Sequence, residues 1–252
     1  MKRWIIYAVF LIYILGGCST MGNKGEIEIV AFGDSNTQGA NWKIRQYPQQ
    51  EKWVTLINTA YSGNLMIHNA GISGETTEDA LKRFEKDVLS KKPDLVFIMF
   101  GTNDAAMLPS GLPRVDKTRF KRNLKYFTKE IRKIGAEPVL MTCLPVIEGS
   151  GTDTYYYSRY DRKWFEAGGG ARQWHNAYND LTREAAREEG AVLVDHWWNL
   201  IDLAGESSDE ALLSSGLIDP SGNHLTPSGA RELYNGIMAS GVLQQFLQQS
   251  SE

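Results

Sequence analysis

The chain has 252 residues, 42% of them hydrophobic and 23% charged, with 27 lysines and arginines against 30 aspartates and glutamates. That composition is typical of a globular protein, and the length suits one large domain. The slightly acidic balance and the lack of a lysine- or arginine-rich block argue against a nucleic-acid partner. Neither Cys18 nor Cys143 has zinc-site spacing to a histidine, so we expect no metal and no organic cofactor.

The first residues follow the pattern of a bacterial export signal. Lys2 and Arg3 precede an apolar run over 4–15 that is too short to span a bilayer comfortably. The run ends in Leu15-Gly16-Gly17-Cys18, which is similar to a lipobox, the motif in which the cysteine is lipidated and becomes the mature N-terminus. A plain secretory signal or an uncleaved anchor is the alternative.

The chain therefore divides into three predicted parts. We expect a signal peptide at 1–17, a tether at 18–25 with the lipid on Cys18, and one folded domain at 26–252. This division predicts an extracytoplasmic lipoprotein that contacts the membrane through its lipid alone.

From residue 26 onward, apolar runs alternate with helical patterns. Strands are predicted at 26–32, 64–70, 94–100, 137–144 and 191–195. Helices are predicted at 49–61, 76–88, 116–134, 174–189 and 226–238. Strands that alternate with helices imply right-handed crossovers, so we expect an α/β fold, a three-layer α/β/α sandwich around a central, mostly parallel five-stranded sheet.

Small polar segments follow three of the predicted strands. Gly33-Asp34-Ser35 follows the first, 69–74 the second and 101–104 the third. Parallel sheets bind ligands beyond the carboxyl ends of their strands, so we expect these segments to share one pocket. Ser35 lies between two glycines at a sharp turn, where backbone N–H groups can stabilise negative charge on an acyl oxygen.

Four pieces of the chain together resemble the SGNH, or GDSL-type, serine hydrolases. They are Gly33-Asp34-Ser35-Asn36, Asn69-Ala70-Gly71, Gly101-Thr102-Asn103-Asp104 and His224, and they occur in the family's order across nearly the whole mature chain. Asn36 stands where the name-giving pattern has leucine. The resemblance implies a flavodoxin-like fold and a serine esterase.

The resemblance also implies a role for each matching residue. Ser35 is then the nucleophile, and its own N–H, the N–H of Gly71 and the side-chain amide of Asn103 form the oxyanion hole. His224 is the general base, which takes the Ser35 proton and returns it to the leaving alcohol. The chemistry agrees, because glycine lets an N–H approach the substrate and a neutral amide favours the oxyanion over the ground state.

The partner of this histidine matches the family less well. The family places an aspartate three residues before the histidine, where this chain has Ser221. Asp219 lies five residues before His224, and the proline and glycine between them let the loop bend back. We predict that Asp219 orients His224. Ser221, a backbone carbonyl, or a serine–histidine pair without a third member are the alternatives.

The other histidines have different interpretations. His196 follows a predicted strand end on the same side of the sheet, so it is the rival candidate for the general base. His68 lies within a predicted strand and suits a satisfied core or edge position. We expect His175, on a predicted helix, at the surface.

A long connection over 146–170 is rich in aromatic residues. Loops of this length after a strand end are often functional, and aromatic faces with polar rims suit sugars. We expect Tyr157 and Trp164 from this segment, with Trp42 and Tyr47 from the connection after the nucleophile, to bind substrate. The alternative is a segment that packs on itself.

Together these patterns predict a serine esterase that removes short acyl groups, acetyl in particular, from a carbohydrate or another small ester through an acyl-enzyme on Ser35. A lysophospholipase or thioesterase acting on lipid is one alternative. A catalytically inactive glycan-binding lipoprotein is another, because the aspartate of the family pattern is missing. The sequence is silent on the oligomeric state.

Overall fold

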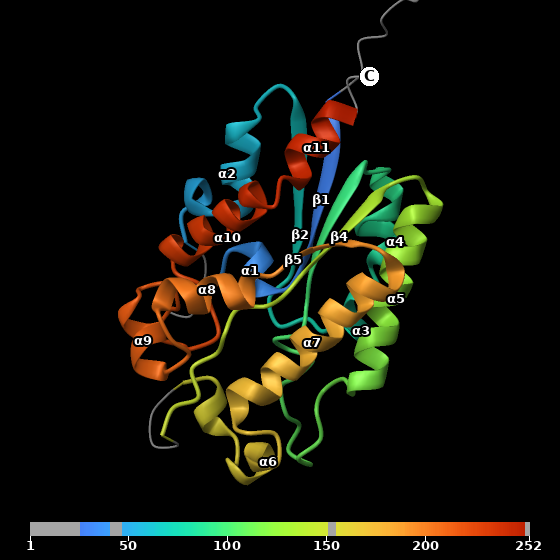
Figure 1. The fold of residues 1–252 in the computed structure, drawn as a ribbon. Helices are drawn as coiled ribbons and strands as arrows, with labels where there is room; N and C mark the ends of the chain where they lie inside the picture. Colours follow the sequence, from blue (N-terminus) through green and yellow to red (C-terminus); the bar gives the residue numbers. More distant parts are fainter. Residues whose placement is uncertain (1–25, 41–46, 151–154, 250–252) are drawn as a thin grey trace, which may run out of the picture.

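The computed structural model describes residues 26–40, 47–150 and 155–249. Its five parallel strands form one sheet in the order β2 (Leu65–Gly71), β1 (Ile27–Gly33), β3 (Leu95–Met99), β4 (Glu137–Met141) and β5 (Val192–Val194) (Figure 1). The predicted α/β fold with a parallel five-stranded sheet is confirmed. The expected signal peptide and tether, and Trp42, lie outside the described residues.

Helices cover both faces of the sheet (Figure 1). One face packs against α2 (Trp53–Ala60), α8 (His196–Ala204), α10 (Pro227–Ala239) and α11 (Val242–Gln249). The other packs against α3 (Thr77–Leu81), α4 (Phe84–Asp87), α5 (Lys117–Lys133) and α7 (Ala171–Glu189). Three short helices lie in connections: α1 (Ser35–Gln38), α6 (Lys163–Glu166) and α9 (Asp209–Ser214). Within the described ranges, no helix has both the length and the apolar character that crossing a bilayer requires.

The central strands are buried on both faces, as their continuous apolar sequences predict. In β1, Ile29 packs toward α2, whereas Phe32 packs toward α5 and places its ring 5.1–5.6 Å from the rings of Phe84, Phe100 and Phe127. Each fully buried side chain of this size contributes about 1.5–3 kcal/mol. The carboxyl end of β1 therefore leaves a well-packed core.

The register brings the three polar segments together. Gly33 at the end of β1 lies opposite Gly71 of β2 and Met99 of β3. The segments that follow these strands consequently start at one level of the sheet, as the sequence predicted.

The structure also departs from the predicted elements. The helix expected at 76–88 begins with a capping box formed by Thr76 and Asp79 but breaks into α3 and α4, and Arg83 lies at the break. Strand β4 ends at Met141 instead of 144, because its ladder with β5 ends where Met141 pairs with Val194. Helices α8 and α11 were not predicted.

Candidate active site

Ser35 lies at the turn between β1 and α1. The Asp34 carboxylate caps this turn by accepting a hydrogen bond from the N–H of Asn36 at 2.9 Å. A side chain at Gly33 would lie 2.7 Å from the carbonyl oxygen of Met99, so the strand end requires glycine. The turn leaves Ser35 4% exposed, with its hydroxyl directed to a segment far away in the sequence.

That segment carries His224, whose Nε2 lies 2.9 Å from the Oγ of Ser35. The chain folds back on itself here, because Ile218 pairs with Leu225 as an antiparallel bridge and the N–H of Asp219 donates to the carbonyl of His224 at 2.8 Å. Thr226 then caps α10. The expected nucleophile and general base, 189 positions apart in the sequence, are thus brought into hydrogen-bonding distance.

The side chain of Asn36 ties the serine turn to this histidine loop. Its Nδ2 donates to the carbonyl of Asn223 at 3.2 Å, and its Oδ1 accepts from the N–H of Leu225 at 3.2 Å. These are the two residues that flank His224. Leucine, which the name-giving pattern has at this position, makes neither bond, and the sequence alone gave no sign of this contact.

The group against the other imidazole nitrogen is a serine hydroxyl. The Oγ of Ser221 lies 2.9 Å from Nδ1 of His224, and it also hydrogen-bonds to Oδ1 of Asp219 and lies 3.1 Å from Oδ1 of Asn223. The Asp219 carboxylate additionally accepts from the N–H of Ser221 at 2.8 Å. The predicted link between Asp219 and His224 therefore runs through Ser221, which occupies the sequence position of the family's aspartate.

The three predicted oxyanion-hole residues differ in how the structure holds them. Asn103 follows β3, and its Nδ2 donates to Oδ2 of Asp34 at 3.3 Å and to the carbonyl of Glu75 at 3.0 Å. The N–H of Gly71 already donates to Oδ1 of Asn69 at 3.0 Å, which argues against its expected role. A side chain at Gly71 would lie 2.8 Å from the carbonyl oxygen of Asp34, so this glycine serves close packing.

Sequence and structure comparisons place these residues in a known group. The family described as GDSL-like lipase/acylhydrolase matches residues 31–232. The chain belongs to this family. As a GDSL-like hydrolase it is an ester-hydrolysing enzyme with the α/β fold described above.

Several relatives of this hydrolase have names that bear on its function. It is 53% identical over 247 residues to "Uncharacterized lipoprotein YqeF" of Bacillus subtilis, which covers 97% of this chain and 100% of that protein. It is 50% identical over 148 residues to an acetylxylan esterase of Geobacillus stearothermophilus, which covers 56% of this chain and 59% of that protein. The crystal structure of a lipase/acylhydrolase from Enterococcus faecalis has the same fold, with a TM-score of 0.62 at 24% identity over 85% of this chain and 95% of that one.

Burial sets the electrostatics of the hydrolase site. Desolvation lowers the pKa of His224 below its ordinary value of 6.5, and the nearby Asp219 charge partly offsets this effect. Desolvation raises the pKa of Asp34 to about 7 and that of Asp104 to about 6. Asp104 accepts from the N–H of Thr77 at 2.9 Å, and Asp34 accepts from the N–H of Asn36. Both side chains therefore bind backbone N–H groups, which is a structural role.

The other histidines do not reach Ser35. His196 is buried, and its ring lies against Gly236 of α10, which excludes it as the rival base in this arrangement. His175 is also fully buried, whereas the helical pattern had predicted a surface position. Its ring stacks on Trp197 with 5.7 Å between centroids, and desolvation lowers its pKa to about 3. His68 pairs with Glu28 at 2.6 Å on the sheet.

The predicted substrate-binding aromatics are not equally placed. Tyr47 and Tyr157 are each 2% exposed. Tyr157 packs in a cluster with Phe165 and His175, although it also lines a cavity of about 300 Å³. Trp164 is half-buried beside Gly111. Much of the long aromatic segment therefore packs on itself, which was the alternative interpretation.

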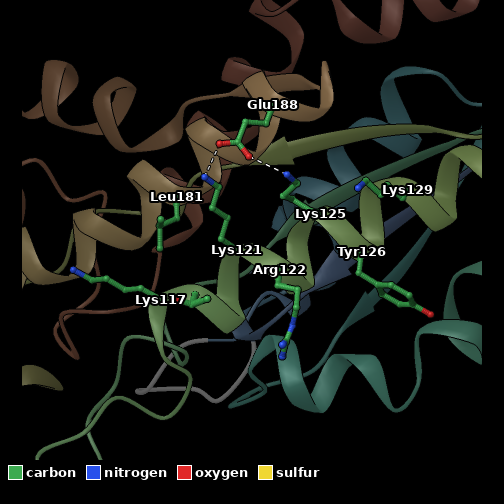
Figure 2. A pocket seen from close by; sticks show the side chains of 9 residues that line it. Lys117, Lys121, Arg122, Lys125, Tyr126, Lys129, Leu181 and Glu188 are labelled. Atoms are coloured by element: carbon green, nitrogen blue, oxygen red, sulfur yellow. Dashed lines mark hydrogen bonds and ion pairs between the residues drawn. The ribbon is translucent and has the colours of Figure 1, made fainter.

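A groove of about 620 Å³ lies away from this site, between α5 and α7 (Figure 2). Several lysines of α5 line it, and two of them pair with Glu188 of α7, Lys121 at 2.6 Å and Lys125 at 2.9 Å. The groove holds no group of the serine–histidine site. Among the described residues no cluster of ligands suits a metal ion.

Proposed function

We propose that this hydrolase removes short acyl groups, acetyl in particular, from a carbohydrate, with Ser35 as the nucleophile and His224 as the general base. The observation that carries the proposal is the 2.9 Å contact between Oγ of Ser35 and Nε2 of His224 at the carboxyl end of the sheet. Nucleophile and base within hydrogen-bond reach, with a third group behind the base, are the arrangement that activates a serine.

In the first step, Nε2 accepts the Ser35 proton while Oγ attacks the acyl carbon. The lowered pKa keeps His224 neutral near pH 7, and donation of Nδ1–H to Ser221 leaves the Nε2 lone pair directed at Ser35. The imidazolium then protonates the leaving alcohol, which leaves an acyl-enzyme. In the second step a water loses a proton to Nε2 and attacks the acyl carbon, and the imidazolium returns that proton to Oγ of Ser35 as the carboxylic acid leaves.

Negative charge on the acyl oxygen requires donors beside Ser35. The N–H of Ser35 is one of them, and Nδ2 of Asn103 is the second, because its 3.3 Å bond to Asp34 is long enough to give way to the acyl oxygen. Because the Gly71 N–H is bonded to Asn69, we assign the third to Gly74, which has a positive φ of 81° and open space at its α-carbon. Gly74 precedes Glu75, whose carbonyl accepts from Asn103, so the two donors lie on adjoining groups.

The serine relay argues against an inactive scaffold. In the relay, Nδ1–H donates to Ser221 and the Ser221 hydroxyl donates to Asp219, so a carboxylate still stabilises the imidazolium one hydrogen bond further away. The missing aspartate was the main support for a glycan-binding protein without turnover. That support is weaker with Asp219 so connected.

The acetyl-carbohydrate assignment draws on the named acetylxylan esterase relative and on Trp164 and Trp42 as candidate sugar contacts. A lipid substrate is the second candidate, because Leu108 and Leu112 are 42% and 63% exposed on the connection that follows β3. Exposed apolar side chains on the connection that carries Asn103 would suit a long acyl chain. Hydrolysis rates on p-nitrophenyl acetate, octanoate and palmitate separate the two candidates by chain length.

We also propose that residues 1–17 are removed and that Cys18 carries a lipid. The lipoprotein name of the Bacillus subtilis relative supports this. Metabolic labelling with an alkyne fatty acid in a bacterial host should label the wild type and leave Cys18→Ala unlabelled. Equal labelling of both proteins would place the lipid elsewhere.

A fluorophosphonate probe tests the catalytic proposal. We expect it to label the wild type on Ser35 and to leave Ser35→Ala unlabelled. Hydrolysis of p-nitrophenyl acetate by Ser35→Ala should fall by about 10⁴-fold or more. Equal labelling and equal hydrolysis by the two proteins would rule out Ser35 as the nucleophile.

A further inference from the structure

Arg83 binds, from behind the site, the segments that carry the proposed oxyanion donors. It lies at the break between α3 and α4, and its side chain is only 11% exposed. Its guanidinium stacks on the ring of Phe32, with the central carbon 4.7 Å from the ring centroid. This contact with the core fixes the plane of the guanidinium beneath the carboxyl ends of β1 and β2.

Two of its hydrogen bonds go to backbone carbonyls at strand ends. Nη2 donates to the carbonyl of Gly33 at 3.3 Å, and Nη1 donates to the carbonyl of Ala70 at 2.9 Å. Gly33 ends β1 and is followed by Asp34 and Ser35, and Ala70 is the penultimate residue of β2, shortly before the connection that leads to Gly74. The same cation therefore binds carbonyls at the ends of the two strands that lead to the nucleophile turn and to the glycine loop.

The third bond leads to Asn103. Nε donates to the carboxylate of Glu75 at 2.6 Å, and the backbone carbonyl of Glu75 accepts from Nδ2 of Asn103 at 3.0 Å. Asp87 completes the set by accepting from Nη1 at 3.2 Å. One planar group with donors in fixed directions thus sets three separate segments relative to one another.

We infer that Arg83 is a positioning residue that aligns the oxyanion hole by binding the Gly33 and Ala70 carbonyls and the Glu75 carboxylate. This inference rests on the proposed function. Donors stabilise an oxyanion only when they are already aimed at it, and an error of 1 Å can cost about 10²-fold in rate. A lysine carries the same charge but cannot reach three acceptors with one rigid plane.

The test compares Arg83→Lys with Arg132→Lys. Arg132 also donates to two backbone carbonyls, those of Glu189 and Gly190, but at the opposite edge of the sheet. For Arg83→Lys we expect kcat on p-nitrophenyl acetate to fall about tenfold to a hundredfold with KM within twofold. Arg132→Lys should lose some thermal stability and keep wild-type kcat.

The Ki of a boronic acid inhibitor measures the alignment of the oxyanion hole independently of the stability of the protein. Its tetrahedral adduct with Ser35 places an oxygen in the oxyanion hole, so its Ki should rise in Arg83→Lys by the same factor as kcat/KM falls. The midpoint of the acid limb of the pH profile should stay at the wild-type value, because the histidine side is untouched. A wild-type kcat and Ki in Arg83→Lys would overturn the inference.

If Arg83→Lys does not fold, Asp87→Asn provides a second test of the same inference. Asp87 contacts Nη1 from α4, and its side chain is 27% exposed. Its replacement should lower kcat severalfold at constant KM, and an unchanged kcat would overturn the inference. Failure of the proposed function is distinguishable, because Ser35→Ala would then retain hydrolysis whatever happens at Arg83.

Discussion

The two halves of the active site are built in different ways. The oxyanion side consists of strand ends and short turns, which Arg83 and the core under Phe32 hold from within. The histidine side is a loop over 218–225, which lies outside the strands of the sheet. The second half is held in place by contacts from distant segments, and this difference predicts different responses to mutation.

Two distant segments hold the histidine loop. Asn36 bonds to the residues on both sides of His224. The N–H of Ile147 donates to the carbonyl of Gly222 at 2.8 Å, and the N–H of Tyr156 donates to that of Ser221 at 2.8 Å. The aromatic segment after β4 therefore supports the general base, whatever part it takes in substrate binding.

The largest effect is expected on the oxyanion side. Asn103→Ala removes one preorganised donor, so kcat should fall by about 10²–10³ with little change in KM. Steady-state kinetics on p-nitrophenyl acetate measure this split. A rise in KM at constant kcat would mean that Asn103 binds the ground state instead.

A smaller loss is expected when the relay is cut. Ser221→Ala should reduce kcat by about tenfold to a hundredfold, less than the ~10⁴ seen where a carboxylate contacts the imidazole directly. Asp219→Asn should cost a similar factor, and the double variant should cost little more, since both act through one chain of bonds. Full additivity of the two losses would show that Asp219 and Ser221 act separately.

The bridge between the halves can be broken at Asn36. Asn36→Leu introduces the residue of the name-giving pattern but loses both bonds to the histidine loop, so kcat should fall about tenfold, since each bond contributes about 0.5–1.5 kcal/mol. Asn103→Ala and Asn36→Leu should multiply their effects if the two halves are independent. An Asn36→Leu enzyme with wild-type kcat would show that the loop is positioned by Ile147 and Tyr156 alone.

The free energy of unfolding should report the contact between the aromatic segment and the histidine loop. At Gly222, φ is +80° and an added Cβ would lie 2.9 Å from Cβ of Ile147, whereas Gly205 has φ +89° and open space. Gly205→Ala should lower the free energy of unfolding by about 1–2 kcal/mol. Gly222→Ala should lose about 1–3 kcal/mol more. Urea unfolding measures both, and equal losses would mean that the contact with Ile147 adjusts freely.

The smallest expected effect is a shift in the pH profile. His224 acts as a base only when neutral, so kcat/KM should rise with pH along a limb whose midpoint lies below 6.5. The Asp219 charge raises the pKa of His224, so Asp219→Asn should move the midpoint further down. Asn103→Ala should leave the midpoint in place, which separates the two halves once more.

The parts that sequence reasoning predicted correctly depend on neighbours in the chain. Alternation of apolar runs and helical patterns gave the sheet and most of its longer helices, and the predicted helix starts at 76, 116 and 226 coincide with the capping residues Thr76, Asp116 and Thr226. The helix at 76–88 failed because Arg83 turns inward to carbonyls of other strands. The prediction of a surface position for His175 was wrong, because the apolar pattern of its helix did not show that the face with His175 is also buried.

The sequence by itself determined the family and the fold and predicted the meeting of Ser35 with His224, since the four motifs resemble those of the family and the strand ends follow from local patterns. The tertiary structure decided which atoms touch. Ser221 lies at Nδ1 of His224, Asn36 binds both residues that flank His224, and the N–H of Gly71 is already hydrogen-bonded. Each of these contacts depends on differences of a few tenths of an ångström in how the segments pack. Such distances follow from packing of the whole domain, which no local pattern encodes.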